Sequence, residues 1–157
     1  MKPKIGISDK NLQSVIDLLS ETLANEVTLY TKTRKFHWNV SGESFMELHK
    51  LFENQYKLLE ASIDEVAERI GKLGNKAIGT MEEFGKLSTV KEHPGKYASS
   101  KEMIMELLMD HETIIIMLRK AVAECAEKHN DAGSSDFLTG LMKEHETIAW
   151  TLRRYLN

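Results

Sequence analysis

Hydrophobic residues recur at helical spacing along four long stretches of the chain. In the first, residues 9–36, apolar side chains return every three or four positions. These positions are Leu12, Val15, Ile16, Leu19, Leu23 and Val27. The same spacing continues through residues 43–72, 99–128 and 135–155, and no stretch has the strict alternation that is typical of a half-buried strand. The pattern predicts an all-α fold with four long helices.

Short polar or glycine-containing segments separate the four stretches. They fall at residues 39–42, 74–75 and 130–135, where serine, glycine and asparagine supply turn chemistry. Four helices with one long link in the middle are typical of a four-helix bundle with a crossover. We expect residues 1–8 to form a short tail and residues 9–157 to form a single domain of this kind.

The middle link, residues 79–95, is too long to be a simple turn. Within it, Thr80 is followed three positions later by Glu83, which is the spacing of a capping box at the start of a helix. The sequence therefore predicts a short extra helix in the connection between the second and third long helices.

Composition narrows the class of protein. The 157 residues are 41% apolar and 29% charged, which fits one soluble domain with a sizeable core. The formal net charge of -3 gives no bulk attraction to nucleic acid. A single cysteine, Cys125, excludes an internal disulfide framework and fits a reducing compartment. The chain has no long apolar run and no basic-then-apolar start, so we expect a cytoplasmic protein without a membrane segment.

One stripe of the second predicted helix collects an imidazole and three carboxylates. His49, Glu53, Asp64 and Glu68 are the members of this stripe. On a helical wheel they fall within a sector of about 100°, directly beside the face formed by the apolar residues. Charged side chains are costly next to a core unless a counter-ion neutralises them. The stripe is a candidate metal site, and a solvated charged face is the competing interpretation.

A single helix cannot bring all four residues to one metal ion. Glu53 and Asp64 are eleven residues apart, which is about 16 Å along a helix axis. An antiparallel copy of the helix can do so, because the pair 49/68 and the pair 53/64 are both centred between residues 58 and 59. A two-fold axis at that point would place His49 opposite the partner's Glu68 and would create two equivalent sites.

The ligand types favour iron. Imidazole with carboxylates suits Fe(II) better than the thiolate sets that select softer metals, and His37 at the end of the first helix is a further nitrogen donor. Ordinary ferritins build their centre inside one subunit with Glu-x-x-His motifs. None of the six histidines here has a glutamate three residues before it, so the sequence leaves either the intersubunit version of such a centre or no centre.

Two segments resemble the signatures of the Dps family of miniferritins. The first is residues 35–42 (KFHWNVSG) with the following residues 45–53, and the second is residues 63–74. The resemblance covers about residues 9–157 and implies a ferritin-like four-helix bundle that assembles into a hollow cage of twelve identical subunits. It also implies a ferroxidase, an oxidoreductase that oxidises Fe(II) with hydrogen peroxide or oxygen, stores Fe(III) and so protects against oxidative damage.

The resemblance assigns iron ligands by position. His37, His49 and Glu53 match ligands from one subunit, and Asp64 and Glu68 match ligands from the subunit across the two-fold axis. The family more often has aspartate at the position of Glu53, and the extra methylene leaves open whether this carboxylate touches the metal directly. Zinc is a substitute metal that such a ligand set also accepts.

The resemblance also implies roles outside the centre. Acidic residues near the last interhelical break line iron-admitting pores in the family; Asp136 matches best, while Asp131 and Glu127 could instead cap the loop. Trp38 and Trp150 match aromatic positions that intercept radicals, for which packing in a core or an interface is the alternative.

Four further residues have structural interpretations. We interpret Lys35 and Arg69 as ion-pair partners that orient helices. His111 and His145, on the third and fourth long helices, are expected to be buried, hydrogen-bonded histidines or interface histidines.

DNA compaction is the alternative function. Some members of the family bind DNA through lysine-rich tails, and nucleoid association would follow from that. Here the tail carries only Lys2 and Lys4, so we expect weak DNA binding, although many copies in one assembly would add their contacts. A purely structural bundle is a third interpretation, which the ligand-type stripe argues against.

Overall fold

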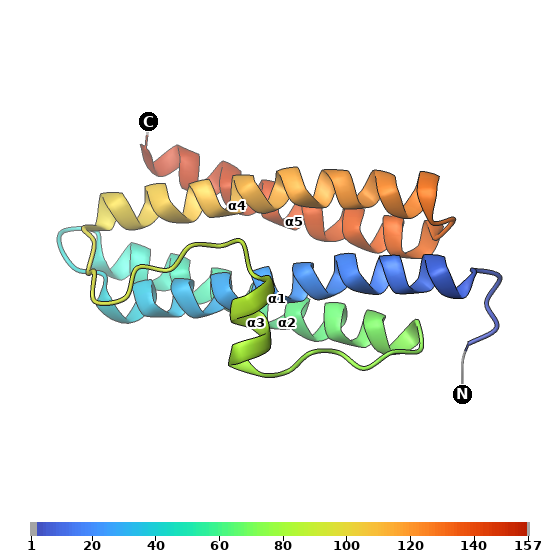
Figure 1. Cartoon of the computed structure of the whole chain (residues 1–157). Coiled ribbons are helices and arrows are strands. Elements are labelled where there is room, and N and C mark those ends of the chain that lie inside the picture. The colour runs from blue at the N-terminus through green and yellow to red at the C-terminus, as the bar shows by residue number, and fades with distance from the viewer. Residues whose placement is uncertain (1–2, 157) are drawn as a thin grey trace.

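Two antiparallel helix pairs pack face to face in the computed structural model (Figure 1). The first pair is α1 (Asp9–Asn39) and α2 (Phe45–Lys72), and the second is α4 (Ser100–Ala123) and α5 (Ala132–Leu156). The short helix α3 (Met81–Leu87) lies in the long connection and packs against the outside of α1. The predicted bundle, its crossover and its extra helix are confirmed.

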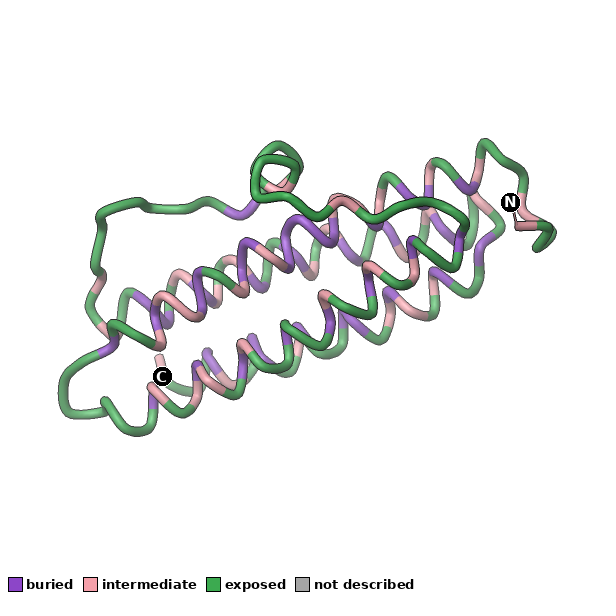
Figure 2. Tube along the Cα trace, turned by 90° about the horizontal axis from the view of Figure 1, so that it is seen from below, coloured by how far each residue is buried: buried purple, intermediate pink, exposed green. Residues whose placement is uncertain are grey.

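The core runs along the whole axis of the bundle. The structure describes residues 3–156, and buried positions recur along the inward faces of all four long helices (Figure 2). The largest side chains with almost no exposed surface are Phe52, Leu19, Leu23, Leu29, Leu48, Leu59, Ile70, Met103, Leu107, Ile114, Leu118 and Leu138. Burial of one apolar face per helix is the main stabilising term of such a bundle. Within the described range, no helix is long and apolar enough to cross a membrane.

Side-chain caps fix where the helices begin. The Ser8 hydroxyl accepts a hydrogen bond from a backbone N–H in the first turn of α1. The predicted capping box of α3 is present, with the Thr80 and Glu83 side chains each bonded to the backbone of the other. Ser99 and Glu102 form a second box at the start of α4.

The junction between α4 and α5 differs from the sequence prediction. The expected helix to Lys128 changes at Glu124 into a π-helical turn, Glu124–Lys128, in which the His129 N–H bonds to the Glu124 carbonyl at 3.1 Å. The last helix starts at Ala132 rather than at Ser135, because the Asp131 carboxylate accepts the Ser134 backbone N–H and caps the first turn.

The described part of the N-terminal segment folds back onto the end of α2. Gly74 follows α2 with a φ of +89°, and a Cβ atom there would lie 2.4 Å from the ring of Pro3. The apolar side chains of Leu12, Ile16 and Leu73 line the same hollow. Glycine is required at this turn because it supplies both the left-handed backbone and the space for Pro3.

Candidate metal centre

Two histidines meet at the hinge between α1 and α2. His37 lies in the last turn of α1 and His49 in the second turn of α2, and their rings stack with 3.8 Å between centroids. The Nδ1 atom of His37 is 2.7 Å from the backbone oxygen of His49, and the Nδ1 atom of His49 is 2.8 Å from the backbone oxygen of His37. The two contacts are reciprocal, as if related by a local two-fold axis.

These contacts determine the tautomer of both rings. A carbonyl oxygen can only accept a hydrogen bond, so each Nδ1 must carry a proton and donate it. In the neutral imidazole, the lone pair is then on Nε2. A hydrogen bond at one ring nitrogen that orients the other toward a cation is the usual arrangement of metal-binding histidines in proteins. Both histidines thus have the electronic form that a metal ligand needs.

Aromatic side chains surround the histidine pair. The Phe45 ring lies 5.1 Å from that of His49, and the Tyr56 ring meets His37 edge-on at 5.3 Å. The guanidinium of Arg34 lies over the Tyr56 ring at 5.0 Å and over the Trp38 ring at 5.2 Å. This packing holds the imidazoles in place and puts a fixed positive charge near them.

The Glu53 carboxylate is occupied by two lysines. One oxygen accepts a hydrogen bond from Lys57 at 2.5 Å and the other from Lys50 at 2.9 Å. The hydrogen bond from Lys57, followed by that from Lys50, lowers the pKa of Glu53 from 4.5 to about 2. The group is therefore a carboxylate over the whole physiological range, and a metal ion would have to compete with ammonium groups for it.

Asp64 and Glu68 lie further along α2, away from the histidines. Both are exposed in the single chain, and Glu68 has only a loose contact to Lys72 at 3.3 Å, with 61% of its side chain exposed. Asp64 lies in a shallow groove that also contains Lys57 and Glu60. Such carboxylates are available to an incoming cation.

The five predicted ligands do not meet on one chain, and the predicted shared centre would use them as two half-sites. One half-site comprises His37, His49 and Glu53, and the other comprises Asp64 and Glu68. Within residues 3–156, no three histidine, cysteine, aspartate or glutamate side chains of the single chain are grouped so that they could hold a metal ion. A centre that includes all five residues would need a second chain, which stays a prediction.

Comparison with known proteins decides the family. A model of the ferritin-like domain matches residues 16–157. The chain is 38% identical to DNA protection during starvation protein 2 of Bacillus anthracis, over 92% of this chain and 98% of the relative. It is 46% identical to a low temperature-induced protein of Nostoc, over 97% of this chain and 85% of the relative. The chain belongs to the Dps family.

Solved structures agree with this assignment. A Dps protein from Vibrio cholerae, described as one of the ferritin-like diiron-carboxylate proteins, superposes with a TM-score of 0.92 at 29% identity, over 99% of this chain and 97% of the other. DpsC from Streptomyces coelicolor gives a TM-score of 0.95 at 27% identity, over 100% and 91% of the two chains. The fold is the ferritin-like bundle of the Dps family, with α3 as its extra helix.

The three acidic residues considered for a Dps pore have different surroundings. Asp131 is buried, and its carboxylate accepts hydrogen bonds from Ser134 and from the guanidinium of Arg69 at 3.2 Å. This is the loop-capping alternative, and it makes Arg69 an ion-pair partner as expected. Asp136 and Glu127 are exposed, so they remain the candidates for attracting cations.

Other predictions meet mixed outcomes. Lys35 forms no ion pair among those found in residues 3–156; it donates to the backbone oxygen of His93 and lies over the Tyr97 ring. Trp38 and Trp150 are 64% and 60% exposed, so neither fills the core of the chain. Packing of these two rings in an interface stays a prediction.

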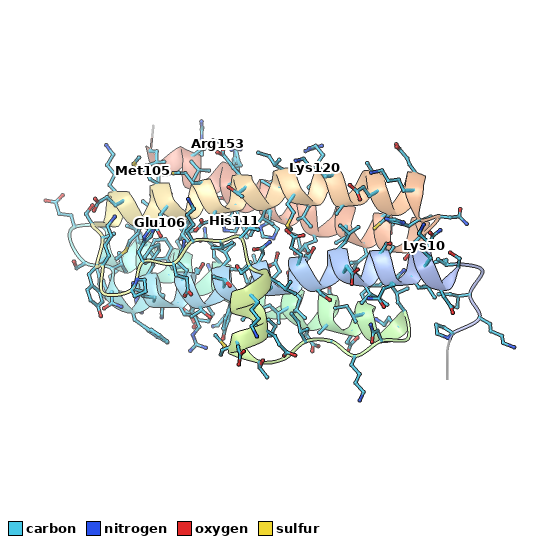
Figure 3. The ribbon with its side chains drawn as sticks, viewed as in Figure 1. Lys10, Met105, Glu106, His111, Lys120 and Arg153 are labelled. Carbon is cyan, nitrogen blue, oxygen red and sulfur yellow. The ribbon has the colours of Figure 1, made fainter. Side chains whose placement is uncertain are left out.

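One polar cluster in the core was only half anticipated. His111 and His145 are buried and hydrogen-bonded to each other, as expected, and His145 Nε2 also contacts the Glu26 carboxylate at 2.7 Å. Figure 3 labels His111 among the side chains of α4. Sequence reasoning missed Glu26. Its signal in the sequence was its spacing, seven residues after Leu19 and three after Leu23, which places it on the apolar stripe of this helix.

Proposed function

We propose that this protein oxidises Fe(II) at centres shared between two subunits and stores the ferric product inside a closed homo-oligomer of twelve chains. The observation that carries the proposal is the separation of the ligand set along α2: His49 and Glu53, joined by His37 of α1, lie toward one end, and Asp64 and Glu68 lie toward the other. The histidine half-site has its Nε2 lone pairs already selected by backbone hydrogen bonds. The carboxylate half-site is exposed and has no metal-binding partner of its own chain among residues 3–156.

An antiparallel α2 from a second subunit would complete each centre. The two-fold axis would pass near residues 58 and 59, so that His49 faces the partner's Glu68 and Glu53 faces the partner's Asp64. Facing carboxylates repel each other unless a cation lies between them. Fe(II), as the substrate, would remove that repulsion, and nitrogen and oxygen donors of this kind suit it.

The chemistry assigns simple roles to the ligands. The histidines and carboxylates would hold a pair of Fe(II) ions while hydrogen peroxide or oxygen takes up their electrons. Carboxylates stabilise the additional positive charge of Fe(III) better than neutral donors do, which favours oxidation at the site. Exposed Asp136 and Glu127 would draw Fe(II) toward the interior. Consumption of Fe(II) together with peroxide would protect a bacterial cytoplasm from oxidative damage.

DNA binding would be a weak secondary property. Pro3 packs onto the end of α2, which holds the described part of the N-terminal segment against the bundle instead of leaving it free to reach DNA. With a net charge of -3 per chain, the assembly would attract phosphates poorly at physiological salt.

Mixed assemblies test the shared centre. One parent carries His37→Ala with His49→Ala, and the other carries Asp64→Ala with Glu68→Ala. Each parent alone should lose Fe(II) oxidation. A two-fold pair with one subunit from each parent keeps one intact centre, so verified mixed particles should regain up to half the activity per pair. A centre within one subunit would stay inactive in every mixture, and that result would refute the proposal.

A further inference from the structure

Lys57 forms an ion pair with one acidic residue and lies in a groove with two others. It lies one helical turn after Glu53 on α2, and its ammonium group bonds to one oxygen of that carboxylate at 2.5 Å. It also lines the groove that contains Glu60 and Asp64. The Lys57 side chain is 57% exposed, so it is free to change partners without leaving a packed position.

Lys50 offers a natural comparison. It bonds to the other oxygen of Glu53 at 2.9 Å, and its side chain is 63% exposed. Within one chain, the two lysines therefore act on Glu53 in nearly the same way. They differ in what an antiparallel partner would bring to them.

The proposed two-fold symmetry gives the two lysines different neighbours in the partner subunit. If the two-fold axis passes near residues 58 and 59 as proposed, position 57 would face the partner subunit's Glu60, and position 50 would face the partner subunit's Ala67. Lys57 gains an acidic group across the interface, whereas Lys50 gains a methyl group. An ammonium displaced from Glu53 would thus keep a carboxylate partner only at position 57.

We propose that Lys57 is an affinity-determining residue of the metal centre. In the metal-free subunit, its ammonium occupies the Glu53 carboxylate. When a divalent cation takes Glu53, Lys57 moves to the partner subunit's Glu60, and this exchange lowers the cost of displacing it. The inference rests on the proposed shared centre and adds a competitor and an exchange partner to it.

The expected effects are modest because the ion pairs are exposed. Ion pairs between exposed side chains change a binding affinity by about 1.4-fold to fivefold. Lys57→Met removes the competitor, so a divalent cation should bind about two to five times more tightly. Glu60→Gln removes the exchange partner and holds Lys57 on Glu53, so the cation should bind more weakly by a similar factor.

A double-mutant cycle isolates the exchange. Co²⁺ is titrated calorimetrically, without oxidant, into assembled particles of the parent, Lys57→Met, Glu60→Gln and the double variant. Glu60→Gln should weaken binding in the parent and have no effect once Lys57 is methionine. In a Lys50→Met background, Glu60→Gln should still weaken binding as in the parent. Lys57→Arg, which keeps the charge, should resemble the parent.

Several results would overturn the inference. One is unchanged or weaker Co²⁺ binding in both Lys57→Met and Lys57→Gln. The second variant guards against a packing defect caused by methionine, and sedimentation verifies that both variants assemble. Another is a Glu60→Gln variant that weakens Co²⁺ binding equally in the parent and in the Lys57→Met background. Failure of the shared centre itself is recognised separately, because mixed particles of the His37→Ala/His49→Ala parent and the Asp64→Ala/Glu68→Ala parent would then not regain Co²⁺ binding.

Discussion

His111 and His145 occupy equivalent positions in two similar segments, DHETI and EHETI, and their Nδ1 atoms meet at 2.8 Å in the core. The ion pairs on either side of them also join equivalent positions of the two helices. Arg153 pairs with Glu112 at 2.7 Å, and Arg119 pairs with Glu146 at 2.6 Å. The pair α4 and α5 therefore has a local two-fold axis that passes between the two histidines.

Glu26 breaks this symmetry, because it contacts His145 and not His111. Burial, and secondarily the nearby His145, lower the pKa of His111 well below its usual value of 6.5. The folded protein therefore keeps His111 neutral, while the unfolded chain takes up a proton there below about pH 6.5. Stability is thus fully present above that pH and is lost as the pH falls.

We expect this acid sensitivity to depend on His111. The urea midpoint of the wild type should fall between pH 7.5 and pH 5.5, and His111→Gln should reduce that fall by removing one proton uptake on unfolding. His93→Gln, at a half-exposed position, is the matched control for a histidine-to-glutamine change outside the core. An equal pH dependence in wild type and His111→Gln would contradict the assignment.

Removal of Glu26 should be strongly destabilising. Glu26→Ala would leave His145 Nε2 without its partner in a site that water does not reach, and loss of one member of a buried pair costs about 3–5 kcal/mol. Glu26→Gln keeps a hydrogen-bond acceptor and should cost clearly less. Chemical unfolding of both variants at pH 7.5 measures the difference, and equal losses would show that the hydrogen bond is unimportant.

Gly74→Ala should release the N-terminal segment. The positive φ and the contact with Pro3 both oppose a Cβ atom, so we expect a loss of about 1 kcal/mol or more and faster proteolytic cleavage before α1. Gly140→Ala, where the added methyl meets no neighbour, should stabilise α5 slightly. If protease cleaves the N-terminal segment of Gly74→Ala no faster than that of the wild type, the packing of Pro3 on α2 contributes little to stability.

Substitutions of Asp136 and Asp131 should have different effects: the first on iron entry and the second on stability. Asp136→Asn removes an exposed negative charge, so it should slow Fe(II) uptake by assembled particles and leave the unfolding midpoint nearly unchanged. Asp131→Asn should lower the midpoint, because it weakens the cap of α5 and the pair with Arg69. Unchanged uptake kinetics in Asp136→Asn would move the entry route elsewhere.

Helical periodicity was enough to predict the bundle, because four amphipathic stretches have few other ways to bury their apolar faces. It could not predict the π-helical turn at Glu124, since one extra residue in a turn hardly changes a hydrophobic pattern. The early start of α5 depends on the Asp131 cap, and the sequence indicated this cap only as an alternative to a pore role. Near the candidate centre, the spacing of His49, Glu53, Asp64 and Glu68 was visible in the sequence. The bonds that fix the histidine rings were not, because they end on backbone atoms.

The reciprocal bonds of His37 and His49 have a consequence for how this centre can vary. Their acceptors are main-chain carbonyls, which every amino acid carries. No side-chain replacement next to either histidine can delete these acceptors as long as the hinge between α1 and α2 keeps its path. A side-chain change at a neighbouring position therefore leaves both bonds available, and the proton stays on the same ring nitrogen.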